Sequence, residues 1–201
     1  MRLRLAFKIA PVIAACVAGG CATQPTNSTG GPYRTIRVEP QRDTEAAKRL
    51  NQVGLDHMAK GDLDKAVESF GRALEADVEF GPAHNNLGKA YFKKREWYQA
   101  AWEFEYARKL LPRHAEPANN LGLVMEEVGE FDKAVNSYRE AVALDPLIDY
   151  RANLVRAMIR RGDRTEEVRD LLQQVAAEDT RPTWQAWARQ QLELVRSPVR
   201  P

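Results

Sequence analysis

The residues that usually carry catalysis or bind metals are few here and scattered along the chain. The three histidines, His57, His84 and His114, lack the i, i+4 companion that a helical metal site needs. The sequence also contains no glycine-rich phosphate loop and no Gly-x-Ser-x-Gly elbow. The acidic pairs Glu126-Glu127 and Glu166-Glu167 fit solvated helix faces. We therefore expect no enzyme activity, no cofactor and no bound metal.

Side-chain amides offer a different chemistry, that of binding. They recur at steps of 34, 34 and 33 residues, at Gln52, Asn86, Asn120 and Asn153. An amide both donates and accepts hydrogen bonds. A row of amides can therefore hold an extended polypeptide backbone largely independently of its sequence, provided that a regular array of elements brings them to one face.

A single repeat period predicts such an array. Gly54, Gly88 and Gly122 lie 34 residues apart. Four further sets keep the same step: Ala66/Ala100/Ala134, Val53/Leu87/Leu121, Phe70/Phe104/Tyr138 and Ala73/Ala107/Ala141. A period of 34 residues is the signature of stacked helical hairpins, which bind partners on an extended surface.

The apolar spacing inside each unit is helical. Leu50, Val53, Gly54 and His57 follow the i, i+3, i+4, i+7 pattern of one helix face. Breaks follow at Lys60-Gly61-Asp62, Arg95-Glu96, Gly129-Glu130, Pro112 and Pro146. The recurring glycine and alanine let two antiparallel helices approach closely, and the aromatic residue fills the space between hairpins.

These residues resemble tetratricopeptide repeats. The middle unit is a near-complete match to the family pattern, with Asn86-Leu87-Gly88, Tyr91, Ala100, Phe104, Ala107 and Pro112. The clear units cover residues 47–80, 81–114 and 115–148. The resemblance implies an all-α solenoid whose role is to bind a protein or a peptide.

The solenoid is expected to continue over the whole of residues 44–196. A fourth unit at 149–180 is degenerate, because Val155 replaces the glycine and the turn gains a residue. The amphipathic segment 183–196 predicts a helix that caps the last open apolar face, since solenoids need such a cap. Its two tryptophans are expected to pack, and the alternative is that they form a ligand platform.

The family resemblance also assigns roles to the surfaces. In tetratricopeptide arrays the first helix of each hairpin lines a concave groove, and the residue before the family's leucine points into it. Those positions hold the four amides named above, and Lys89 and Lys93 with Glu126 and Glu127 predict a groove of mixed sign. The alternative is that the amides are simply solvated. The lysine-and-asparagine clamp that some relatives use for a terminal carboxylate is not reproduced, because Leu55 and Glu116 stand in its place.

A stripe of aromatic residues predicts a second surface. Tyr98, Trp102 and Tyr106 are spaced i, i+4, i+8 on the second helix of the middle unit. The core face of that helix is already supplied by other residues, so the stripe is expected on the convex side. Exposed aromatic clusters tend to mark interaction surfaces. The stripe therefore predicts a partner-binding surface or a contact between copies, and partial burial is the alternative.

The N-terminal residues predict a lipoprotein signal peptide over 1–20. Three basic residues precede an uncharged run, 9–20, that is too short to span a membrane. Val17-Ala18-Gly19-Gly20-Cys21 resembles a bacterial lipobox, which implies an acylated Cys21. Cys16 is a rival position, but it leaves only 9–15 as the apolar core. The alternative is an ordinary secretory signal with an incidental cysteine.

Removal of such a signal changes the formal net charge from +2 to −1, so nucleic acid is not an expected partner. Residues 21–43 are expected to form the lipidated cysteine and a flexible tether, because 23–40 is rich in Thr, Asn, Ser, Gly and Pro. About 20 such residues span roughly 25 Å on average. Residues 197–201 are expected to form a disordered tail.

The resemblance to lipoproteins with tetratricopeptide repeats implies a location and a role. Ala22 after the cysteine, rather than Asp, is what such lipoproteins show when sent to the outer membrane, facing the periplasm. Lipoproteins of this kind include type IV pilus pilotins, which have more repeats, and organisers of cell-wall enzymes. We expect a scaffold for an envelope complex; the alternative is a self-associating structural module without a peptide ligand.

Overall fold

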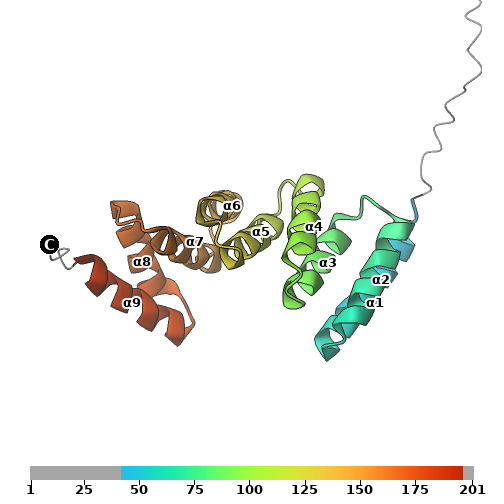
Figure 1. Cartoon of the computed structure of the whole chain (residues 1–201), viewed down its shortest axis with the longest axis horizontal. Coiled ribbons are helices and arrows are strands. Elements are labelled where there is room, and N and C mark those ends of the chain that lie inside the picture. The colour runs from blue at the N-terminus through green and yellow to red at the C-terminus, as the bar shows by residue number, and fades with distance from the viewer. Residues whose placement is uncertain (1–41, 197–201) are drawn as a thin grey trace, which may run out of the picture. The chain divides into compact units, whose positions relative to one another are not determined.

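The computed structural model describes residues 42–196, and each regular element in that range is an α-helix (Figure 1). In chain order the helices are α1 (Thr44–Lys60), α2 (Leu63–Ala76), α3 (Gly81–Lys93), α4 (Trp97–Leu110), α5 (Ala115–Glu127), α6 (Phe131–Leu144), α7 (Ile148–Arg161), α8 (Glu166–Glu178) and α9 (Pro182–Arg196). The predicted signal peptide, Cys21, nearly all of the tether and the tail lie outside the described residues.

Consecutive helices pair into hairpins, α1–α2, α3–α4, α5–α6 and α7–α8, and each hairpin packs against the next one along the chain (Figure 1). Helix α9 packs on α8. The predicted all-α solenoid, with three regular hairpins, a degenerate fourth and a terminal helix, is confirmed.

The turns inside the hairpins fall where the sequence predicted them. Helix α1 ends at Lys60, and Gly61 adopts the left-handed conformation with φ 81° before α2 begins. In the second hairpin Arg95 takes this conformation with φ 62°. For a residue with a Cβ atom the left-handed conformation costs about 1–2 kcal/mol. The second hairpin therefore tolerates local strain that glycine avoids in the first.

The helices of each regular hairpin meet at a glycine. A Cβ atom built on Gly88 would lie 2.7 Å from two ring carbons of Phe104, and one built on Gly122 would lie 2.6 Å from Tyr138 Cε1. Both distances are below van der Waals contact, so only glycine permits this approach. Both rings are buried.

The fourth hairpin solves the same packing problem differently. Val155 and Leu172 occupy the places held elsewhere by the glycine and the aromatic ring, and both are fully buried. A larger residue on α7 is thus matched by a smaller one on α8.

The two ends of the array differ. Val53 shares its repeat position with Leu87 and Leu121, yet it is 45% exposed while Leu87 is 5% exposed. Leu87 is covered by α2 of the preceding hairpin, and within residues 42–196 no hairpin precedes α1. At the other end, Ala188 and Leu192 of α9 pack into the core with Leu172 of α8, which confirms the predicted cap.

We expect Gly88→Ala to destabilise the fold by about 1–3 kcal/mol, because the new methyl group overlaps Phe104. The measurement is the unfolding free energy from urea denaturation. The matched control is Gly71→Ala in α2, where a Cβ meets nothing within 4 Å. That variant should be neutral or more stable by up to about 1 kcal/mol. Equal effects of the two changes would contradict the packing argument.

Candidate partner-binding surfaces

The first helices of successive hairpins form a continuous wall. Helix α3 contacts both α1 and α5, and α5 contacts α7. Between second helices there is no contact of comparable extent in the part of the chain that the structure describes. The first helices therefore lie on the more closely spaced side of the array. We call these four helices the first-helix wall.

Pairs of asparagines join the helices of this wall. In each pair an Nδ2 group donates to the Oδ1 atom of an asparagine on the preceding first helix. The donor and acceptor pairs are Asn86–Asn51 at 3.0 Å, Asn120–Asn85 at 3.0 Å and Asn153–Asn119 at 2.9 Å. The third pair confirms that Asn153 is equivalent to Asn120, so the fourth unit is shifted by one residue.

These hydrogen bonds limit which polar atoms the predicted amides can present to a peptide. Asn86 and Asn120 are buried, Asn153 is half-buried, and each uses its Nδ2 group on a neighbouring helix. Gln52 is exposed and donates instead to Asp56 of its own helix at 3.1 Å. The asparagines therefore brace the wall, which a simple solvated row would not do. Their binding of a peptide stays a prediction.

The acceptor asparagines were missed at the level of sequence. Asn51, Asn85 and Asn119 lie at the same 34-residue step and immediately precede the selected positions in each unit. The repeat alone could have identified them. Only the pairing across helices shows that they act with the neighbouring unit.

An exposed ion pair crosses the middle of the wall. Lys89 Nζ of α3 lies 2.9 Å from Glu116 Oε1 of α5. Partial burial raises the pKa of Glu116, but Lys89 and the amides of Asn85 and Asn120 outweigh it and hold that pKa below its ordinary value. Lys93, one turn further along α3, is exposed and makes no ion pair within residues 42–196. The wall thus presents both signs of charge, with Glu116 rather than Glu126 as the negative partner of Lys89.

Glu126 corrects one expectation. Its side chain is 3% exposed, so it does not belong to a solvated face as predicted. The carboxylate accepts from Tyr138 Oη at 2.8 Å, from Arg156 Nε and Nη2 at 2.9 and 2.6 Å, and from Arg160 Nη1 at 3.1 Å. Burial raises the pKa of Glu126, but the hydrogen bonds and charges of these donors lower it by more. The pKa therefore lies below its ordinary value. Glu127 is exposed as expected.

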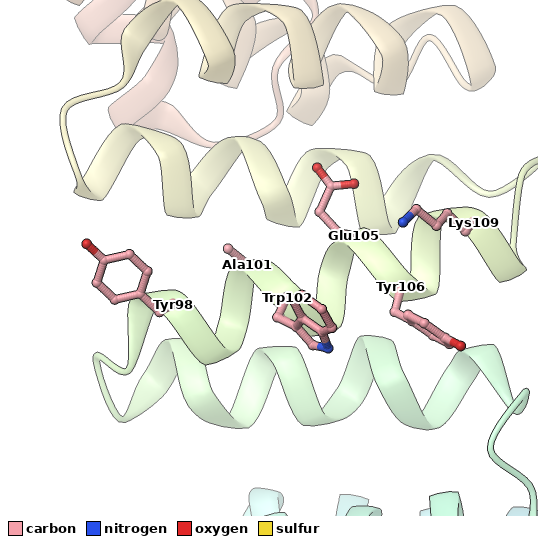
Figure 2. A pocket seen from close by; sticks show the side chains of 6 residues that line it. All are labelled: Tyr98, Ala101, Trp102, Glu105, Tyr106 and Lys109. Atoms are coloured by element: carbon pink, nitrogen blue, oxygen red, sulfur yellow. The ribbon is translucent and has the colours of Figure 1, made fainter.

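The aromatic stripe lies on the outer side of α4, as the sequence predicted. Figure 2 shows the rings of Tyr98, Trp102 and Tyr106 in a row along this helix. Tyr98 is 91% and Trp102 is 70% exposed, while Tyr106 is half-buried with its ring centroid 4.6 Å from that of His84. With Ala101 and two charged residues the stripe borders a shallow cavity of about 330 Å³. The exposure of Tyr98 and Trp102 is confirmed, Tyr106 follows the alternative of partial burial, and the role of the stripe as a binding surface stays a prediction.

Of the three histidines, His84 has the contacts of a structural residue. His84 is buried, with Nδ1 2.6 Å from Glu103 Oε2 and Nε2 2.9 Å from the carbonyl oxygen of Val78. His114 is exposed at the start of α5. Among residues 42–196 no cluster of histidine, cysteine and carboxylate side chains has the arrangement of a metal site. Within the same residues, no helix is long and apolar enough to cross a membrane.

Two family matches agree with this geometry. Residues 54–94 match the family described as TPR repeat, and residues 115–148 match the family described as Tetratricopeptide repeat. The chain therefore carries repeats of the tetratricopeptide class over these residues. Proteins of this class are scaffolds that bind other proteins and peptides, and they are typically not catalysts.

Known proteins of several kinds are similar to the chain. It is 26% identical over 141 residues to the type IV pilus assembly protein PilF of Pseudomonas aeruginosa. The aligned residues cover 70% of this chain and 51% of PilF. It is 29% identical over 112 residues to anaphase-promoting complex subunit 3 of Schizosaccharomyces pombe, covering 56% of this chain and 16% of that protein. The chain thus spans no more than about half the length of these relatives.

Solved structures share the fold. The first TPR of Spaghetti (RPAP3), bound to the HSP90 peptide SRMEEVD, superposes with a TM-score of 0.59 at 18% identity, covering 61% of this chain and 98% of that one. MamA superposes with a TM-score of 0.57 at 24% identity, covering 76% and 81%. At these identities the likeness concerns the fold alone.

The buried Glu126 predicts a pH dependence. Because its pKa is lower in the folded state, its contribution to stability is present above its ordinary value of 4.5 and is lost as the pH falls through the folded value. We expect Glu126→Gln to cost about 1–3 kcal/mol at neutral pH and to flatten the acid loss of unfolding free energy below about pH 5. The exposed neighbour provides the control, Glu127→Gln, which should keep the wild-type profile. Urea denaturation across pH measures both, and a wild-type profile for Glu126→Gln would refute the assignment.

The exposure of the stripe predicts that its central ring contributes little to stability. Trp102→Ala should change the unfolding free energy by less than about 0.5 kcal/mol. Trp97→Ala is the comparison, since that half-buried ring packs on Phe92 with centroids 5.2 Å apart and should cost about 1–3 kcal/mol. A large stability loss from Trp102→Ala would show that the stripe belongs to the core.

Proposed function

We propose that the chain is a lipid-anchored scaffold of the bacterial envelope that holds a protein or an extended peptide in an envelope complex. The complex would be a pilus or secretion machine, or a set of cell-wall enzymes. The observation that carries the proposal is the first-helix wall braced by three asparagine pairs. A braced surface is preorganised, which reduces the entropy lost when a partner docks.

The polar surface of the wall supports an interaction with a polypeptide. Lys89 and Glu116 offer a cation and an anion at one place, and Lys93 adds an unpaired cation one turn away. An ion pair beside an unpaired cation favours a partner with a matching pattern of charges and fixes its register. Such a surface suits an extended chain better than a small molecule, which requires a concave and mostly apolar site.

Two features support the envelope as the location. The N-terminal sequence has the order of a lipoprotein signal, with Cys21 as the residue to be acylated and Ala22 after it. The second feature is the similarity to PilF, whose name assigns that protein to type IV pilus assembly. In this proposal the lipid anchors the chain in the outer membrane, and the chain faces the periplasm.

Crosslinking in cells followed by mass spectrometry tests the proposal. We expect the wild-type chain to capture an envelope protein from the membrane fraction, and Lys93→Glu to weaken that capture about tenfold, equivalent to ~1.4 kcal/mol. Lys133→Glu, a matched reversal on the exposed face of α6, should leave it unchanged. Cys21→Ser should release the chain from membranes, whereas Cys16→Ser should not. Capture that ignores Lys93, or membrane retention of the Cys21→Ser chain, would count against the respective part of the proposal.

A self-associating module is the second candidate, and the exposure of Trp102 favours it. In that case the stripe on α4 joins two copies. Sedimentation velocity distinguishes the candidates, because self-association through the stripe should rise with concentration in the wild type and disappear in Trp102→Ala. A wild-type chain that stays monomeric throughout rules out this candidate.

A further inference from the structure

A cavity lies where the last repeat meets the terminal helix. It measures about 240 Å³ and is lined by Arg156 of α7 and by Thr183, Trp184 and Trp187 of α9. By the register of the asparagine pairs, Arg156 is equivalent to Lys89, so it stands on the first-helix wall. The cavity is therefore the C-terminal end of the surface to which the partner-binding role is assigned.

The guanidinium of Arg156 is held in a fixed position. Its Nε and Nη2 atoms donate to the two carboxylate oxygens of the buried Glu126, and its carbon lies 5.1 Å from the ring centroid of Trp184. Arg160 donates to the same carboxylate. Two guanidinium groups thus share one carboxylate, which leaves an excess positive charge beside the cavity.

The remaining lining is rich in unused donors. Trp184 and Trp187 are half-buried, with ring centroids 5.3 Å apart and an interplanar angle of 76°. Neither indole N–H group nor the Thr183 hydroxyl makes a hydrogen bond to another group within residues 42–196. An indole N–H only donates, and so does a guanidinium. A ligand that satisfies this lining must supply acceptors and an apolar surface.

We infer that this cavity, which we call the Arg156–Trp187 pocket, binds a carboxylate next to an aromatic or large apolar side chain on the protein partner. The carboxylate faces the guanidinium of Arg156, and the apolar side chain lies against the indole of Trp187. The inference rests on the proposed function, since it supplies the chemistry of one contact with the partner. The carboxylate can belong to an acidic side chain or to a chain terminus, which share this chemistry.

The test uses the full chain and three small probes. N-acetylphenylalanine carries a terminal carboxylate, N-acetylaspartylphenylalanine amide carries a side-chain carboxylate, and N-acetylphenylalanine amide carries none. The chain has four tryptophans, so four indole N–H signals can be followed by NMR and assigned by single Trp→Phe changes. At least one acidic probe should shift the Trp184 and Trp187 signals saturably in the millimolar range, more weakly at high salt, and leave Trp97 and Trp102 unmoved.

The chain offers a matched pair of variants. Arg156→Gln and Arg160→Gln each remove one guanidinium from Glu126, but only Arg156 lines the pocket. We expect Arg156→Gln to weaken binding of the acidic probe at least about tenfold and Arg160→Gln to change it less than about threefold. Where Arg156→Gln fails to fold, Arg156→Lys serves instead, because it keeps the charge and loses the two-pronged geometry.

The acidic probe that binds more tightly shows whether the carboxylate belongs to a chain terminus or to an acidic side chain. No saturable shift with either acidic probe, or equal shifts with the neutral amide, overturns the inference. So does equal weakening by Arg156→Gln and Arg160→Gln. These outcomes do not bear on the capture experiment. A chain that still captures an envelope protein through Lys93 would support the proposed function, and only the inference about the Arg156–Trp187 pocket would be wrong.

Discussion

The close approach of a glycine on one helix to an aromatic ring on the next is the constraint on which this fold depends. At Gly88 and Gly122 the ring occupies the space that a Cβ atom would need. The fourth hairpin lacks both partners and still packs, because Leu172 is smaller than an aromatic ring and leaves room for the side chain of Val155. Each hairpin packs against the next, and the resulting spacing brings successive first helices into contact.

That spacing allows a second layer of interactions. Asparagine pairs such as Asn120–Asn85 connect each first helix to the one before it, inside a region that is nearly dry. A buried amide without a partner is costly, so these pairs favour one register over its neighbours. At the end of the array Glu126 adds a second connection between α5 and α7, through Arg156 and Arg160, beside the Asn153–Asn119 pair. The wall is thus held by polar contacts laid over an apolar core.

Much of this arrangement was predictable from residues alone. The 34-residue step of Gly54 and its equivalents fixed the hairpins, and the outward position of Trp102 followed from a core face already filled by Ala100, Phe104 and Ala107. One prediction failed, and one repeat position differs from its equivalents, for the same reason. Val53 is exposed and Glu126 is buried because burial depends on the neighbouring hairpin, which the position of a residue in its own repeat does not describe.

The sequence by itself determined the number of hairpins, their turns and the face of each helix that enters the core, because these follow from local spacing and from the steric demands of glycine and proline. Only the tertiary structure decided which polar side chains pair and which remain open to a partner. Asn86 and Lys93 stand on the same helix, yet one is bonded across the wall and the other faces solvent. The difference lies in the distance to a neighbouring helix, a quantity set by packing between units.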